Sequence, residues 1–144
     1  MDNCYTITID GKQEATDTTE HVSLSTLGHF SRKGNTFCIE YEESETTGFA
    51  GNVTTLVVED SQRATLRRSG KTNSELVIEP GQKHLCHYDA GEVSFVIGVL
   101  ADRIQNRLGD RGGELKLRYA LDFNSNAVSV NELNITVREN TTNA

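Results

Sequence analysis

Hydrophobic and polar residues alternate along much of this 144-residue chain. The clearest runs are Leu115-x-Leu117-x-Tyr119-x-Leu121-x-Phe123 and Phe37-x-Ile39-x-Tyr41. A strand with one buried face produces this pattern, because its successive side chains point to opposite sides. The alternation therefore predicts a protein built mainly from half-buried β-strands.

Turn sequences separate these runs at short, regular intervals, which is typical of an all-β sandwich or barrel. Two of the expected turns are Asp10-Gly11 and Pro80-Gly81, and the second suits a type II turn, in which Gly adopts a positive φ. Strands are expected near residues 4–10, 21–30, 35–44, 52–59, 63–68, 74–79, 83–88, 92–108, 114–123 and 127–138.

These expectations define a fold class. We predict one all-β domain over residues 1–139, an antiparallel up-and-down barrel of about eight to ten strands with little helix. Closure is expected because long exposed strand edges invite aggregation. Residues 140–144 form a polar C-terminal tail.

Residues 97–108 fit two descriptions. Apolar residues recur there at helical spacing, but the β-branched residues that lead into the segment favour a strand. As a regular strand, the segment would place Asp102 and Asn106 on the same face as Leu100, Ile104 and Leu108. We predict a strand.

Composition narrows the possible functions. A net charge of −7 argues against nucleic-acid binding, which needs clustered Lys and Arg. No segment approaches the roughly 18 apolar residues of a membrane helix, and residues 1–20 lack a signal-peptide pattern. The odd number of cysteines, Cys4, Cys38 and Cys86, indicates a reduced cytoplasmic protein with three free thiols.

Strand direction and parity together predict a cluster at one barrel end. If neighbouring strands alternate in direction, those near 35–44, 63–68, 83–88 and 114–123 all run the same way. Their ends then meet, and parity turns one set of side chains inward. We expect the cluster to contain Tyr41, Glu43, Arg68, Tyr88 and Tyr119.

Two interpretations of this cluster remain open. An inward guanidinium can bind a carboxylate or phosphate, and tyrosines supply apolar walls with polar tips, so the cluster could hold a small anionic ligand. Alternatively, Arg68 simply pairs with Glu43, because a buried charge needs a partner, and side chains fill the barrel. The protein would then be a solid-core structural or protein-interaction module, and homo-oligomers are compatible with both interpretations.

Signals for metal binding and catalysis are weak. The segment His84-Leu85-Cys86-His87 contains zinc-ligand residue types, but His84 and His87 would face opposite sides of a strand. The sequence has no Gly-x-Ser-x-Gly elbow and no Gly-rich phosphate loop before a helix. We expect no metal or cofactor, and the pattern favours a binding or structural protein over an enzyme.

Several short motifs carry a family resemblance. They are Tyr41-Glu42-Glu43-Ser44, Thr54-Thr55-Leu56, Arg68-Ser69-Gly70, the Pro-Gly-x-x-His run of 80–84, Tyr88 before Gly91, and Gly113-x-Leu115-x-Leu117-x-Tyr119. In order and spacing, from about residue 4 to 139, the chain resembles the bacterial YwiB-like family. The resemblance implies a calycin (lipocalin-like) barrel and a bacterial cytoplasmic setting, and it implies no activity.

Overall fold

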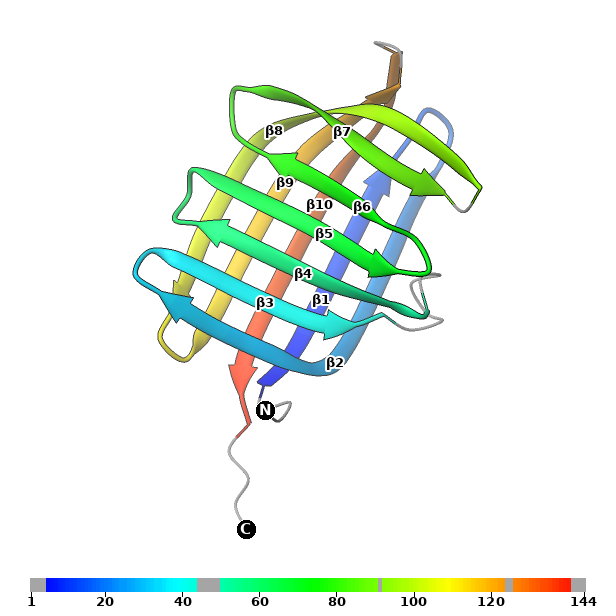
Figure 1. Cartoon of the computed structure of the whole chain (residues 1–144). Coiled ribbons are helices and arrows are strands. Elements are labelled where there is room, and N and C mark those ends of the chain that lie inside the picture. The colour runs from blue at the N-terminus through cyan, green and yellow to red at the C-terminus, as the bar shows by residue number, and fades with distance from the viewer. Residues whose placement is uncertain (1–4, 44–49, 91, 124–125, 141–144) are drawn as a thin grey trace.

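The computed structural model describes residues 5–43, 50–90, 92–123 and 126–140, and within these ranges it contains strands and no helix. The strands are β1 (Tyr5–Glu14), β2 (Thr19–Lys33), β3 (Thr36–Glu42), β4 (Asn52–Glu59), β5 (Arg63–Gly70), β6 (Ser74–Ile78), β7 (Lys83–Ala90), β8 (Val93–Gly109), β9 (Gly112–Phe123) and β10 (Asn126–Glu139). Each strand pairs antiparallel with its sequence neighbours, and β1 also pairs with β10 (Figure 1). The predicted closed up-and-down barrel is confirmed.

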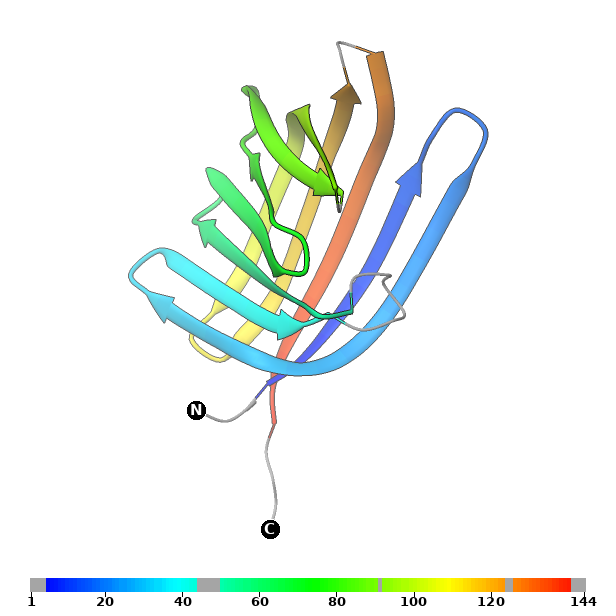
Figure 2. The same ribbon diagram turned by 45° about the vertical axis from the view of Figure 1, so that its right-hand side comes forward.

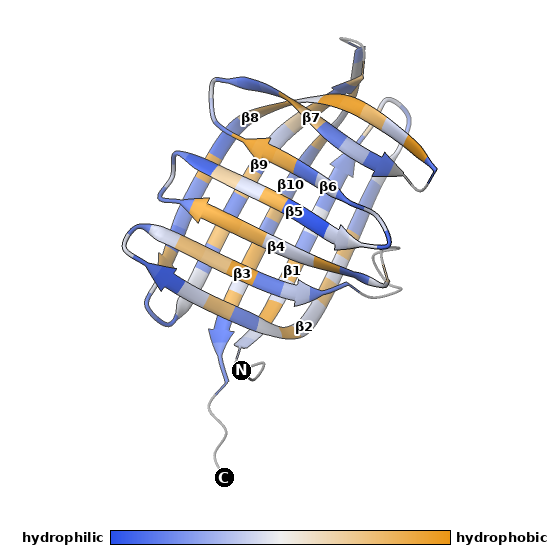
Figure 3. Ribbon diagram, viewed as in Figure 1, coloured by the Kyte–Doolittle hydropathy of each residue, from blue (hydrophilic) through white to orange (hydrophobic). Residues whose placement is uncertain are grey.

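Hydrophobic and hydrophilic residues alternate along many of the strands (Figure 3), and this alternation separates the interior from the solvent. In β9, for example, Leu115 and Leu117 are buried, whereas Glu114, Lys116 and Arg118 between and beside them are exposed. The completely or almost completely buried apolar side chains come from strands all around the barrel and include Ile7, Ile39, Leu56, Val58, Ile78, Val99, Leu115 and Leu117. Each such side chain contributes about 1.5–3 kcal/mol to folding.

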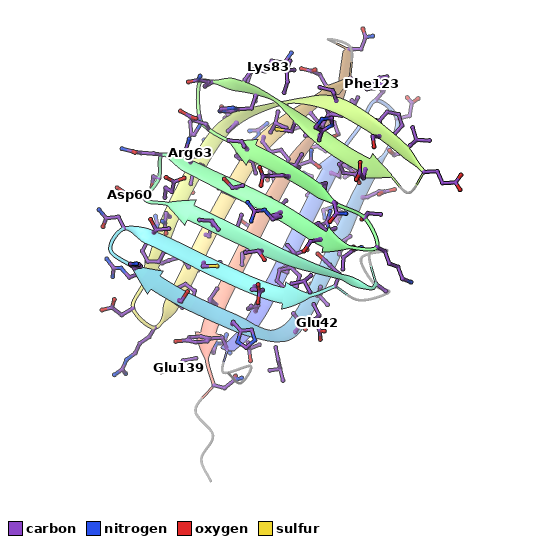
Figure 4. All side chains as sticks on the ribbon, in the orientation of Figure 1. Glu42, Asp60, Arg63, Lys83, Phe123 and Glu139 are labelled. Atoms are coloured by element: carbon purple, nitrogen blue, oxygen red, sulfur yellow. The ribbon has the colours of Figure 1, made fainter. Side chains whose placement is uncertain are left out.

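Aromatic rings fill one end of the barrel. Phe30 lies between Tyr5 and Phe37, with ring centroids 5.3 and 6.3 Å away. The Arg32 guanidinium lies 5.0 Å from the centroid of the Phe37 ring and donates to Asp110 on the β8–β9 turn at 2.9 Å. This is the end that holds the β2–β3 turn, the β8–β9 turn and the β4–β5 turn, where Figure 4 labels Asp60 and Arg63. It is a solid core.

The segment 97–108 is a strand, as predicted, but its face assignment was wrong. A β-bulge between Ala101 and Arg103 inserts one residue into β8. The extra residue shifts the alternation, so Ile104 and Leu108 point inward while Leu100 and Asp102 are exposed.

The two expected turns had different outcomes. Asp10-Gly11 is not a turn: β1 continues to Glu14, and the chain reverses at residues 15–18, where the Ala15 N–H donates to the Thr18 carbonyl. Gly11 instead pairs across the ladder with Leu133 and Val22. Pro80-Gly81 is a turn, with Gly81 at a φ of 79° and a 3.1 Å hydrogen bond from Gln82 to Glu79.

Strand β2 belongs to the barrel over only part of its length. It pairs with β1 from Thr19 to Gly28, but with β3 only from Gly28 to Lys33. Figure 2 shows the β1–β2 hairpin projecting past the end of β3. At the junction, a Cβ on Gly28 would clash with the Ile7 side chain and the Glu40 carbonyl. Glycine therefore permits the close three-strand contact at which the hairpin leaves the barrel.

Candidate functional site

The barrel interior is not filled at the end opposite the aromatic core. A cavity of about 300 Å³ opens there, lined by residues from nearly every part of the barrel wall. All five side chains of the cluster expected from strand parity line it, namely Tyr41, Glu43, Arg68, Tyr88 and Tyr119. The fold thus brings together side chains from β3, β5, β7, β9 and the segment after β3.

Sheet register explains why these residues meet. Tyr41 in β3 pairs with Thr54 in β4, and Thr54 pairs with Arg68 in β5. Arg68 pairs with Ser74 in β6, and Ser74 pairs with Tyr88 in β7. Directly paired residues point to the same face, so this row of five polar residues crosses five strands on the inner face of the barrel.

An ion pair lies at the centre of this polar row. Nη2 of Arg68 lies 3.4 Å from Oε2 of Glu43, and the Thr54 hydroxyl donates to the same oxygen. The Glu43 side chain is 1% exposed, whereas that of Arg68 is 16% exposed. Both side chains line the cavity, and Arg68 is the more accessible partner of the pair.

Two tyrosine hydroxyls adjoin the ion pair and stay protonated. Burial raises the pKa of Tyr119 to about 12. The positive charge of Arg68 acts to lower this pKa, and Tyr88 acts to raise it. Burial, followed by the negative charge of Glu43, raises the pKa of Tyr41 well above its usual value. At neutral pH both side chains thus present hydroxyl groups that can donate to an anion or accept from a donor.

The remaining wall of the cavity is mostly apolar. It comes from β1, β2, β9 and β10 and consists chiefly of Ile9, Val22, Leu121, Leu133 and Ile135. Four polar side chains, Lys12, Gln13, Glu20 and Asn131, line the cavity from the same strands. The cavity therefore combines one wall that holds the ion pair and the tyrosine hydroxyls with one mainly apolar wall that also includes Lys12 and Glu20.

Sequence reasoning missed Thr54 and the whole apolar wall. Thr54 shares the parity of Leu56 and Val58, so the alternation of β4 does carry the signal that its hydroxyl points inward. The apolar wall could not be inferred, because buried leucines that line a cavity have the same pattern as those that fill a core.

A second hollow lies outside the barrel. It has a volume of about 500 Å³, is more open to solvent, and is lined from β5, β6, β7 and the start of β8. Arg67 crosses it to pair with Glu75 at 2.6 Å. Of the five cluster residues only Arg68 reaches it. The inner cavity, which all five line, is the candidate site.

The histidines and cysteines do not converge. His84 points inward and bonds Glu79 at 3.0 Å, whereas His87 is exposed on the opposite face. Cys86 is buried and accepts from the Val77 N–H at 3.4 Å, and both Cys38 and Cys86 are free thiols. Within the described ranges, no three His, Cys, Asp or Glu side chains are grouped to hold a metal ion. Cys4 lies outside the described residues.

The fold and the cavity together define a class of small, closed, ten-stranded up-and-down barrels with one filled end and one hollow end. Residues 7–135 match a family described as a domain of unknown function (DUF1934), and the chain belongs to this family. Among curated proteins, none matches the sequence. The described residues contain no helix that is long and apolar enough to cross a membrane.

A solved structure shares the fold. The ywiB protein from Bacillus subtilis is similar to this chain with a TM-score of 0.83 and 18% sequence identity. The similarity covers 95% of this chain and 92% of the other. It shows that the two proteins share a fold, and with the family match it supports the resemblance to the YwiB-like family.

Proposed function

We propose that this protein binds a small amphipathic molecule with an anionic head group in the hollow end of its barrel. The observation that carries the proposal is the difference in exposure between Arg68 and Glu43 in a cavity with an opposite hydrocarbon wall. In this proposal the ligand lies inside the barrel, as it does in calycins. The protein is cytoplasmic, a setting with which the free thiols of Cys38 and Cys86 are compatible.

The Arg68–Glu43 pair favours an anion over a cation. Glu43 is held by Arg68 and Thr54 and is nearly inaccessible, so its charge orients the guanidinium. The exposed part of Arg68 and the protonated Tyr119 then offer hydrogen-bond donors to a ligand oxygen. Hydrogen bonds that involve a charged group are about twice as strong as neutral ones.

The cavity also limits the size and shape of the ligand. A volume of about 300 Å³ is at the lower end of the range for small-molecule sites. The apolar wall matches a compact hydrocarbon or aromatic body next to the acidic group. A carboxylate, sulfonate or phosphate on a ring system fits this description, whereas a long lipid chain does not.

A structural role for the ion pair is compatible with this proposal. The aromatic end already supplies a filled core, so the barrel does not need a second polar plug to exist as a folded protein. The competing function, a solid-core structural module, requires instead that the cavity take up no ligand. Binding of a probe molecule decides between them.

The test uses two fluorescent probes with matching bodies. Anilinonaphthalene sulfonate carries an anionic group on an aromatic body, and phenylnaphthylamine has the same body without the charge. The proposal predicts that the Arg68→Met change weakens sulfonate binding by at least about tenfold and alters binding of the neutral probe by less than about twofold.

Two controls make the test specific. Because Arg68→Met leaves the Glu43 carboxylate buried without the guanidinium, the comparison is repeated between Glu43→Gln and the Glu43→Gln, Arg68→Met double variant. Leu85→Glu places a charge on the outer face, where Leu85 is 74% exposed, and should leave sulfonate binding intact. The proposal would be disproved if Arg68→Met left the affinity for the sulfonate unchanged. It would also be disproved if Leu85→Glu abolished sulfonate binding.

A further inference from the structure

The projecting half of β2 has one edge that no strand pairs with in the described part of the chain. Residues Thr19–Leu27 pair with β1 on one side, and on the other side no strand in the described part of the chain pairs with them. Nine residues exceed the usual strand length of about five to six. Figure 2 shows the β1–β2 hairpin standing away from β3, and Glu20 and Val22 of this stretch line the cavity.

The direction of the backbone groups follows from the β1–β2 turn. The hydrogen bond from the Ala15 N–H to the Thr18 carbonyl marks a hydrogen-bonded pair, and such pairs alternate along an antiparallel ladder. Even-numbered residues from Glu20 to Thr26 therefore bond to β1. The N–H and C=O groups that point to the open edge are those of Thr19, His21, Ser23, Ser25 and Leu27.

This edge lacks most of the features that usually prevent strand addition. It contains no proline and no lysine, and its register with β1 runs without a bulge. Proline, lysine and bulges are devices that commonly blunt edge strands, and of the further device, an inward-pointing charge, this edge has one instance, Glu20. The segment carries a single formal charge, that of Glu20, in a chain whose net charge is −7.

We propose that a second copy of this chain pairs antiparallel with β2 across a two-fold axis at Ser23. This register pairs the whole open stretch with itself, because Ser23 is its central residue. It places His21 opposite Ser25 of the second copy. The backbone N–H and C=O groups that point to the open edge on one strand can therefore hydrogen-bond to those of the other strand. No charged residue faces a like charge, because Glu20 lies opposite Thr26.

The pairing also completes the cavity. Val22 and Glu20 line the cavity from the β2 side, and even-numbered side chains share that inward face. In the proposed register, Leu24 of the partner subunit lies beside Val22 on the same face. The dimer therefore extends the hydrocarbon wall across the open side of the hollow end, and this inference holds whichever ligand the cavity takes.

Sedimentation and light scattering of the full chain test the dimer. The native chain should be a dimer, and Ser25→Pro should weaken association by at least about tenfold while keeping the β-sheet circular dichroism spectrum. Ser25→Ala keeps the N–H, and Leu85→Glu alters a 74% exposed apolar side chain of β7, far from the β2 edge in sequence, so both should remain dimeric. A monomeric native chain, a Ser25→Pro dimer of native strength, or a dimer lost in Leu85→Glu would overturn the proposal.

Disulfide formation between two copies tests the register of the β2–β2 pairing without introducing a proline. Opposed residues of a hydrogen-bonded pair have Cα atoms about 5.5 Å apart, which a disulfide can span. Under a mild oxidant, Ser23→Cys should therefore form a covalent dimer much faster than the native chain or Leu85→Cys. An equal rate in all three chains would refute the two-fold pairing at Ser23.

Discussion

Arg68 and Glu43 contact each other inside the barrel, with Nη2 and Oε2 3.4 Å apart, although 25 residues separate them in the sequence. Strand β4 lies between them and contributes Thr54, whose hydroxyl donates to the same Glu43 oxygen. The pair thus links β5 to the segment after β3 through the interior. Its location makes it both a stabilising contact and the charged wall of the cavity.

The ion pair should show strong thermodynamic coupling. We expect Arg68→Met to lower the free energy of unfolding by about 3 kcal/mol, because it leaves a carboxylate buried without its cation. The value is near the lower end for buried pairs because Arg68 is partly exposed. Guanidinium-chloride unfolding of this variant, Glu43→Gln and the double variant measures the effect.

The double variant provides the control. It should be more stable than the sum of the single losses predicts, by at least about 1 kcal/mol. Strictly additive losses would show that Arg68 and Glu43 stabilise the barrel independently of each other.

Stability should fall in alkaline solution partly because of Tyr119. Its pKa is raised from 10.0 in the unfolded chain to about 12 in the folded barrel, so the folded state holds the proton more tightly. The resulting stability is complete below pH 10 and is lost as the pH rises to about 12. The total loss from this residue is about 2–3 kcal/mol.

Denaturant unfolding between neutral pH and pH 11 should therefore show a shallower alkaline decline for Tyr119→Phe than for the native chain. Equal slopes for the two proteins would mean that Tyr119 ionises as readily in the barrel as in the unfolded chain.

Gly28 should not tolerate a side chain. A Cβ there would clash with the Ile7 side chain and the backbone carbonyl of Glu40, so Gly28→Ala is expected to cost about 1–3 kcal/mol. Gly109 is the matched control, since its nearest contact would be an ordinary 3.8 Å. Thermal unfolding of Gly28→Ala and Gly109→Ala compares them, and similar midpoints would argue against the tight junction.

The cysteines should react slowly in the folded protein. Burial is the main reason that the pKa of Cys38 and that of Cys86 are raised, so little thiolate forms at neutral pH. Titration of the unfolded, unreduced chain should count three thiols, including Cys4, and native Cys86 should be protected from alkylation. A count of one would indicate a disulfide and contradict the reduced state.

Alternation and strand direction were sufficient for much of the architecture. Ten strands of alternating direction place the ends of β3, β5, β7 and β9 together, and inward parity then selects Tyr41, Arg68 and Tyr119. These inferences depend only on the two-residue repeat of a strand, which the sequence displays directly.

Other features depend on three-dimensional context. The bulge after Ala101 changes the parity of β8 without a local signal in its residue types. Asp10-Gly11 has turn chemistry, yet it lies inside β1, where pairing with β2 and β10 overrides local preference. Whether leucines such as Leu121 and Leu133 fill a core or line a cavity depends on packing across the barrel.

The β1–β10 seam has a consequence for how the barrel is made. Nine antiparallel pairings join consecutive strands and can form as the chain leaves the ribosome, but the tenth pairs Tyr5 with Glu139. Until β10 is translated, both β1 and β9 expose an unsatisfied edge to other nascent chains. Because this closure spans nearly the whole sequence, folding should be slow, on the millisecond-to-second scale of non-local β proteins. Protection during synthesis therefore matters more for this barrel than its modest length suggests.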